Sequence, residues 1–379
     1  MPRSPKLRRR AAIALAAAAS LGLAGCTTTA SGTSASQAPI AKDDIVLVAS
    51  VINTTNPYMA SMIQGAQALS KKLDVPLQIV DSEGSSQTVI SKIQAILAQG
   101  KKVALMVNTV ASSDAPTIVN AVKAAGGYVT IYWNKPDNLE PKTSGNNFVS
   151  FQKYSGVESG KCNADKLGAA LGNKGGVIML PGVQDSTTSQ TRVAGFKAEM
   201  KAKYPGVKIL EEVPSNWDPQ LGFKNTQSMI AKYGDQISGV WAADDAMMLG
   251  AIQAFQQKGL AKKVAFASDG LYPPTIKLMQ DGDANIVGET FHRGYMAAAT
   301  GLYTSYLAAT GDLKVADMTP AQRDGLFKLS CVSPETLSDY TKWDDDIDGW
   351  VDQLVEKGPF DTEPAPLVGQ GPEKLPSTD

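Results

Sequence analysis

The chain has 379 residues, of which 43% are hydrophobic and 19% are charged. This balance is typical of a soluble globular protein and excludes a disordered or membrane-embedded one, and the length suffices for two domains of ordinary size. The formal net charge is −1, and 31 basic and 37 acidic residues remain once five basic residues of the N-terminal segment are set aside. A mildly acidic chain argues against a nucleic-acid partner.

Residues 1–25 have the pattern of a secretory signal peptide. Five basic residues and no acidic one precede a short apolar run, which is too short to span a membrane as a helix. The run ends in Leu23-Ala24-Gly25-Cys26, which resembles the cleavage box of bacterial lipoproteins. This resemblance implies that Cys26 becomes the first residue and carries lipid; the alternative is an ordinary secreted protein with a cysteine there. Residues 26–42 predict a flexible tether. We therefore expect an exported protein, held by lipid on the outer face of the cell membrane or free in the periplasm.

Two more cysteines, Cys162 and Cys331, belong to the exported part. An oxidising compartment permits a disulfide between them. Two unpaired buried thiols are an equal alternative, because no spacing brings the pair together. Two cysteines and the single histidine, His292, do not make a standard zinc set. We therefore expect no metal and no cofactor.

From residue 44 onwards, short apolar strands alternate with longer helical patterns. Strands are predicted at 45–51, 76–80, 103–107 and 128–133. The helices between them start at Pro57, with Asn56 as N-cap, cover about 89–97 with an end at Gly100, and cover about 114–125. Continuous apolar strands between amphipathic helices predict a parallel sheet that is covered on both faces.

A segment rich in Pro, Asn and Gly at 134–151 interrupts the alternation, which then starts again. The second series has predicted strands at 176–180, 207–213, 239–242, 263–267 and 285–289, and predicted helices at 155–172, 188–203, 218–233, 245–258 and 273–281. A helix at 293–309 and a strand at 327–332 follow both series. The fold class predicted is therefore α/β, with two Rossmann-like parallel-sheet lobes, late segments that cross back between them, and a ligand cleft at the junction.

The lobe boundaries follow from this division. We expect lobe 1 to contain residues 43–148 plus about 290–325, and lobe 2 to contain 149–289 plus about 326–340. Residues 341–379 form a C-terminal extension, which is acidic at first and then Pro-rich. We expect this extension to be partly ordered.

Polar and aromatic side chains collect in the loops that follow predicted strands. The loops read NTTNPY (53–58), YWNKP (132–136), PGVQDSTTSQTR (181–192), SNWDP (215–219), AADDA (242–246) and ASDG (267–270). In open α/β sheets, ligands bind at the carboxyl ends of the strands, where such loops meet. We expect rings that stack on a ligand and side chains that bind its hydroxyls: Tyr58, Trp133 and Trp217 for the first role, and Asn56, Arg192, Asp244 and Asp269 for the second. This combination suits a sugar or polyol.

Each of these residues also has a purely structural interpretation. Asp244 and Asp269 could cap the helices that follow them, and Trp133 and Trp217 could be core rings. The joint pattern favours a site, because all of the candidates fall on corresponding ends of different strands. We assign no role to His292 beyond that of a structural or surface histidine.

Over about residues 43–333 the chain resembles the ribose/galactose type of periplasmic sugar-binding proteins, the extracytoplasmic receptors of ABC uptake systems. The resemblance rests on NPYMASMIQGAQ, QIVDSE, QAILAQGKKVALMVN, RVAGF, AADDAMMLGAIQAF, the strand that ends in SDG, and DGDANIVGET. It implies two lobes joined by a three-strand hinge. It also implies ligand contacts at Asn56, Tyr58, Met59, Arg192, Trp217, Asp244, Asp269 and, at the hinge, Glu289 or Thr290.

One departure from the family pattern concerns the ligand. Where pentose-binding members carry an Asp-Arg pair after the fourth strand, this chain has Trp133 and Asn134, which we include in the predicted site. A lost charged pair and a gained ring argue against ribose itself. Another polyol, a modified sugar or a less polar ring is left open.

The resemblance implies a monomeric receptor that closes two lobes on a small ligand and delivers it to an ABC permease. A single histidine and the lack of G-x-S-x-G, GKS/T and G-x-G-x-x-G motifs argue against an enzyme. Two alternatives are a receptor that feeds a sensor or chemotaxis system, and a binding protein for a non-sugar ligand such as a nucleoside or an aromatic compound.

Overall fold

The computed structural model describes residues 38–363 and 366–376. The predicted signal peptide, Cys26 and the predicted tether as far as residue 37 lie outside the described residues. Within the described ranges, the strands form two sheets, and each sheet is the centre of one lobe. None of the helices in these ranges is both long and apolar enough to span a bilayer.

The first lobe is built on a seven-stranded sheet, which is parallel except for one edge strand. Its strands, in sheet order, are β13 (Leu367–Gln370), β11 (Asp324–Phe327), β5 (Phe148–Tyr154), β4 (Tyr128–Tyr132), β3 (Lys102–Asn108), β1 (Ile45–Val51) and β2 (Leu77–Asp81). Its helices are α1 (Pro57–Leu73), α2 (Ser86–Leu97), α3 (Ala115–Ala124), α10 (Gly294–Thr310) and α12 (Ile347–Lys357), with the short α4 (Pro141–Ser144) and α11 (Pro320–Arg323).

The second lobe is built on a six-stranded sheet, again with one antiparallel edge strand. Its strands, in sheet order, are β12 (Ser330–Val332), β10 (Asn285–Phe291), β9 (Ala265–Ala267), β8 (Ile237–Ala242), β6 (Gly175–Leu180) and β7 (Val207–Glu212). Its helices are α5 (Gly156–Ala170), α6 (Thr187–Lys203), α7 (Pro219–Tyr233), α8 (Asp245–Gln256) and α9 (Pro273–Asp281). The predicted fold class of two α/β lobes is confirmed.

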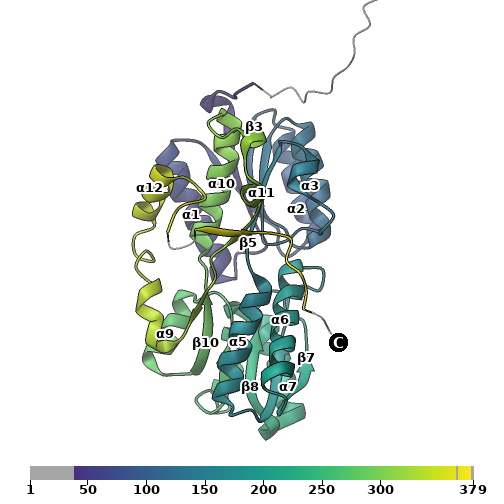
Figure 1. The fold of residues 1–379 in the computed structure, drawn as a ribbon, viewed down its shortest axis with the longest axis vertical. Helices are drawn as coiled ribbons and strands as arrows, with labels where there is room; N and C mark the ends of the chain where they lie inside the picture. Colours follow the sequence, from purple (N-terminus) through teal and green to yellow (C-terminus); the bar gives the residue numbers. More distant parts are fainter. Residues whose placement is uncertain (1–37, 364–365, 377–379) are drawn as a thin grey trace, which may run out of the picture. The chain divides into compact units, whose positions relative to one another are not determined.

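The central strands are buried over their whole length because helices cover both faces of each sheet. All seven residues of β1 and of β5, and all five of β4, are buried. On the first sheet, α1 and α10 lie side by side (Figure 1). Side-chain caps begin the helices that leave the strand ends: Asn56 accepts a hydrogen bond from the Tyr58 amide, and Ser186 accepts one from the Ser189 amide. These caps fix where each loop after a strand turns into its helix.

Four connections cross between the lobes in the described ranges, one more than the family resemblance implies. They run from β5 to α5, from β10 to α10, from β11 to β12, and from β12 to α12. Two details differ from the predictions. The predicted start of lobe 2 at residue 149 falls inside β5, which pairs with β4 and β11 in the first sheet. The strand predicted at 327–332 is two strands in different sheets, because the chain crosses between lobes at Lys328 and Leu329.

A disulfide joins Cys162 of α5 to Cys331 of β12, so the pair that the sequence left open is bonded. The two residues are 169 positions apart in sequence, and their Cα atoms are 5.9 Å apart. Because β12 follows one of the crossing connections, this bond holds the start of the returning chain against the second lobe.

The C-terminal extension is ordered over most of its length and packs on the connections between the lobes. Helix α12 packs against α1, and β13 pairs with β11 before the chain continues toward α6 (Figure 1). Further on, the Glu373 carboxylate forms an ion pair with Lys153 (2.6 Å) and accepts hydrogen bonds from Ser155 and from the amides of Gly156 and Val157. Glu373 thereby binds the junction of β5 and α5, which is one of these crossings.

We predict that Glu373→Gln destabilises the fold at neutral pH. Burial disfavours the charge, but Lys153 and three hydrogen-bond donors hold the pKa of Glu373 below its usual value. A depressed pKa stabilises the fold above the usual pKa of Glu, and this stabilisation is lost as the pH falls through the folded value. Urea unfolding should therefore give a free energy about 2–4 kcal/mol lower for the variant at pH 7.

The difference between wild type and Glu373→Gln should shrink as the pH falls below about 4. Glu356→Gln, which changes an exposed carboxylate on α12, is the matched control and should unfold like the wild type. An equal effect of the two substitutions at pH 7 would contradict the assigned role of Glu373.

Candidate functional site

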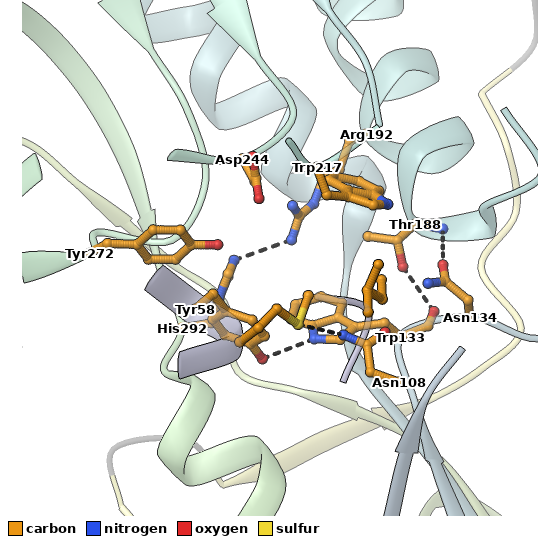
Figure 2. A pocket seen from close by; sticks show the side chains of 12 residues that line it. Tyr58, Asn108, Trp133, Asn134, Thr188, Arg192, Trp217, Asp244, Tyr272 and His292 are labelled. Carbon is orange, nitrogen blue, oxygen red and sulfur yellow. Dashed lines mark hydrogen bonds between the residues drawn. The ribbon is translucent and has the colours of Figure 1, made fainter. Parts of the chain in front are cut away.

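A cavity lies between the carboxyl ends of the two sheets. About 320 Å³ of space in and at the mouth of this cavity is not filled by protein atoms. The first lobe contributes residues from the ends of β1, β3 and β4 and from the start of α1, and the second lobe contributes residues from α6 and from the loops after β7, β8, β9 and β10 (Figure 2). The lining residues are Ile52, Tyr58, Met59, Asn108, Trp133, Asn134, Thr188, Arg192, Trp217, Asp244, Tyr272 and His292.

The residues that line the cavity are almost fully buried. None of the twelve lining residues is more than 5% exposed. Direct hydrogen bonds join the lobes around it: Asn134 Oδ1 accepts from Ser186 Oγ (2.8 Å) and from the Thr188 amide (3.1 Å), and Asn56 Nδ2 donates to Asp244 Oδ2 (2.7 Å). A molecule can therefore enter or leave only when the lobes part.

Aromatic rings form most of the cavity wall. Tyr58 stacks on Tyr272 with ring centroids 5.7 Å apart, so one ring from each lobe meets across the cleft. Trp133 Nε1 donates to Tyr58 Oη (2.9 Å), which fixes both side chains (Figure 2). Trp217 packs flat on Gly182, where a Cβ would lie 2.1 Å from the indole. Flat apolar surfaces of this kind bind the C–H faces of small ligands.

Two of these rings stand on strained backbone. Trp133 has φ 76° and Trp217 has φ 61°, and bulky residues rarely adopt positive φ. Such conformations cost about 1–3 kcal/mol each and persist where the surroundings impose them, often at binding sites. In both residues the strained backbone aims a large ring at the cleft.

Arg192 is the cation of the cavity, and its guanidinium is held on several sides. Nη1 donates to the Ala243 carbonyl (2.5 Å), Nη2 lies 3.2 Å from His292 Nε2, and the group stacks 5.0 Å above the Trp133 ring. Behind it, Asp269 Oδ2 lies 3.8 Å from Nε and balances the charge. These contacts give Arg192 a single orientation.

Asp244 is the carboxylate of the cavity and caps α8. It accepts hydrogen bonds from the Met247 amide (3.1 Å) and from Asn56 of the other lobe. Burial raises the pKa of Asp244 to about 7, although these two hydrogen bonds act in the opposite direction. The group therefore changes its charge near neutral pH.

Four of the sixteen buried side-chain atoms without a hydrogen-bond partner in the described residues belong to the cavity lining. They are Asn108 Oδ1, Arg192 Nε, Trp217 Nε1 and His292 Nδ1. An unmade buried hydrogen bond costs about 1–3 kcal/mol. Four such atoms in one cavity indicate a site that is completed by a polar ligand.

The predicted site residues divide into two groups. Seven of them line the cavity together: Tyr58, Met59, Trp133, Asn134, Arg192, Trp217 and Asp244. The other four, Asn56, Asp269, Glu289 and Thr290, are fully buried but do not line it.

The four residues outside the cavity wall bind other protein groups. Asn56 holds Asp244 and the Trp217 carbonyl. Asp269 accepts from Ser159, from Thr290 and from Asn163 Nδ2 (3.2 Å), so its oxygens are occupied behind Arg192. Glu289 accepts from the Leu271 amide (3.4 Å), and burial, followed by the charge of Asp245, holds the pKa of Glu289 well above its usual value. For these residues the arrangement favours a positioning role over direct ligand contact.

The sequence interpretation missed five lining residues: Ile52, Asn108, Thr188, Tyr272 and His292. Asn108 is the last residue of β3 and Tyr272 follows β9, so the rule that found the other loops could have found them. The sequence interpretation assigns His292 a structural or surface position. The surface position is wrong, because His292 is buried. It is 2% exposed and lies beside Tyr58 because Gly294, where a Cβ would be 2.1 Å from the Tyr58 carbonyl oxygen, lets the start of α10 approach α1.

No group of three or more metal-binding side chains occurs among the described residues. The chemistry of the cavity is instead that of rings, amides, one guanidinium and one carboxyl group.

We predict that Asp244 makes the fold less stable as the pH rises from about 4 to 7. Its pKa is about 7 in the folded chain and about 4 when unfolded, so the folded state binds more protons in this window. The free energy of unfolding should therefore fall with pH for wild type relative to Asp244→Asn, which carries no titrating group there. Chemical unfolding of both proteins at several pH values measures this difference, and a constant difference would show that the carboxyl is not perturbed.

Comparison with known proteins identifies the family. The model of the periplasmic binding protein domain matches residues 47–306. The ribose import binding protein of Escherichia coli is 29% identical over 244 residues, which are 64% of this chain and 77% of that protein. The xylitol-binding protein of Mycolicibacterium smegmatis is 24% identical over 301 residues, 79% of this chain and 80% of that one.

Among solved structures, a twin-arginine translocation pathway signal protein from Burkholderia phytofirmans is similar to this chain. It has a TM-score of 0.77 and 30% sequence identity, and the match covers 81% of this chain and 94% of that one. The family match spans both lobes and includes all twelve residues that line the cavity. The chain therefore belongs to the periplasmic binding protein family.

Proposed function

We propose that this chain is the extracytoplasmic solute-binding receptor of an ABC importer. It binds a sugar or polyol between its two lobes and passes it to a permease in the membrane. The observation that carries this proposal is the buried cavity with aromatic walls and four unpartnered polar atoms. Members of the family are binding proteins and not enzymes, and ribose and xylitol are the ligands in the names of two relatives.

The residues of the cavity suit such a ligand. Sugars and polyols have apolar C–H faces and polar hydroxyl edges. Tyr58, Trp217 and Tyr272 supply flat surfaces for the faces, and Asn108, Arg192 and Asp244 supply donors and acceptors for the edges. Asp244 is half neutralised near pH 7, so the cavity has little net charge to offer an ionic ligand.

Binding is coupled to closure because both lobes contribute to the cavity wall. A ligand can shift an open–closed equilibrium only by its difference in affinity for the two states. In the open state it would contact residues of one lobe, such as Tyr58 or Trp217, but not both. Closure thus follows from contacts that exist only when the lobes meet, and the closed form is the one that a permease would recognise.

The remaining features concern where and how the receptor acts. We propose that it acts as a monomer, outside the cell membrane, and that lipid on Cys26 holds it there. The sequence of residues 23–26 supports the anchor, and the Ser- and Thr-rich residues that follow would give the receptor reach. Periplasmic binding proteins are exported, in agreement with the N-terminal sequence pattern.

Trp217→Ala should weaken ligand binding by about 30-fold or more, because a buried ring at the centre of a site contributes about 2 kcal/mol or more. The ligand is first found by a thermal-shift screen of sugars, polyols, nucleosides and amino acids, since a ligand of the native state raises the melting temperature. Calorimetric titration then measures the affinity. Trp343→Ala, outside the cavity, is the matched control and should bind like the wild type. Unchanged affinity of Trp217→Ala would place the site elsewhere.

Cys26→Ser should release the protein from the membrane, because a serine cannot carry the thioether-linked lipid. The measurement is a fractionation of cells that express the full chain, followed by immunodetection in the membrane and soluble fractions. Cys162→Ser tests whether loss of any cysteine has this effect, and that variant should remain with the membrane. If the Cys26→Ser protein still sediments with the membranes, the anchor is wrong.

A further inference from the structure

His292 has a hydrogen-bonding state that its surroundings fix. The imidazole is buried, and Nε2 lies 3.2 Å from Nη2 of Arg192 (Figure 2). A guanidinium has only donors and stays charged at every relevant pH. The Nε2 atom must therefore accept this hydrogen bond and carries no hydrogen.

The ring is also neutral. Burial, and then the charges of Arg192 and Arg293, hold the pKa of His292 well below its usual value. A neutral imidazole carries one proton, and with Nε2 engaged as an acceptor this proton is on Nδ1. The other tautomer would point two N–H groups at each other across 3.2 Å and would lose the bond to Arg192.

The Nδ1–H group has no partner among the described residues. Rings surround the imidazole, with centroids 4.9–6.3 Å from its own: Tyr58, Trp133, Tyr154 and Tyr272. These rings give Nδ1 no hydrogen-bond acceptor, and a buried donor without an acceptor costs about 1–3 kcal/mol. Because His292 lines the cavity, a bound molecule is the group that can supply the missing acceptor.

We propose that His292 determines ligand specificity: Arg192 holds it as the Nδ1–H tautomer, and this N–H donates a hydrogen bond to an oxygen of the bound sugar or polyol. The inference rests on the proposed function and specifies one hydrogen bond of the site, in which His292 is the donor and the ligand is the acceptor. The ligand must present an oxygen lone pair to Nδ1. A deoxy analogue with a C–H there leaves the donor unpaired and is rejected, as in other sites built around a ligand hydroxyl.

The tautomer can be measured without any ligand. His292 is the only histidine of the 379 residues, so the full chain labelled with ¹⁵N-histidine, and carrying no histidine tag, gives one pair of ring nitrogens. Arg192 lies on α6 of the second lobe, and His292 lies on the connection from β10 to α10, directly after the second-lobe strand β10. NMR at neutral pH should show a protonated Nδ1 and an unprotonated Nε2. The opposite tautomer or an imidazolium would overturn the proposal.

The ligand contact is tested with ribose and xylitol as probes, each added in excess. A probe that raises the melting temperature should also shift the Nδ1–H resonance. His292→Asn keeps a donor near the position of Nδ1, whereas His292→Gln keeps an acceptor for Arg192 and loses that donor. For the bound probe, His292→Gln should weaken affinity about tenfold more than His292→Asn. An unchanged resonance, or equal loss in the two variants, would overturn the donor role.

Failure of the proposed function would look different. If neither probe nor any compound of the screen raises the melting temperature, the receptor proposal fails and the donor role falls with it, while the ligand-free spectrum still decides the tautomer. If a probe binds but the tautomer is Nε2–H, the receptor proposal stands and the role of His292 is wrong.

Discussion

The structure of the site depends on one buried cation. Arg192 is 3% exposed, and a guanidinium in such a place must be paired and hydrogen-bonded to be tolerated. Its partners come from three successive strand ends of the second lobe: the Ala243 carbonyl after β8, Asp269 after β9 and His292 after β10. The guanidinium thereby fixes the relative positions of these loops, and its stacking on Trp133 extends that order to the first lobe. Asp269 pairs with the side of the guanidinium that faces away from the cavity, which explains why Asp269 does not line the cavity.

The alternation of strands and helices was readable from the sequence because both sheets are buried on two faces. Continuous apolar runs such as IVLVASV have that single explanation in a soluble chain, and β1 spans the predicted residues 45–51. The strand β5 was missed because it follows a loop rich in Pro, Asn and Gly and reads FVSFQKY, with polar residues at alternate positions. Those polar residues are buried in this case by other parts of the chain, including α11, where the Gln322 carbonyl binds Ser150. Such a strand forms because it pairs with segments that are distant in sequence, and the local sequence does not predict that pairing.

Part of the site could be predicted from the sequence, because residues at the carboxyl ends of parallel strands lie at the same edge of a sheet. The loops after β1, β4, β7 and β8 were found by that rule, and their rings and polar groups converge. The rule cannot tell which of two neighbouring carboxylates faces the cavity. Asp244 and Asp269 both follow a strand and both are buried, yet only the former lines the cavity, because Ser159 and Asn163 of α5 and Thr290 of β10 bind the latter. Those partners are more than twenty positions away in sequence, or lie on other elements, so their contacts appear only in the folded chain.

Two opposing terms act on closure of the two lobes. The hydrogen bonds between the lobes, such as those of Asn134 with Ser186 and Thr188, favour closure by about 1 kcal/mol each. The unpartnered atoms of the cavity oppose it, because closure strips them of water and gives them nothing in exchange, at about 1–3 kcal/mol each. A ligand removes the second term and leaves the first. The four atoms that a ligand would satisfy therefore also oppose closure until a ligand is present.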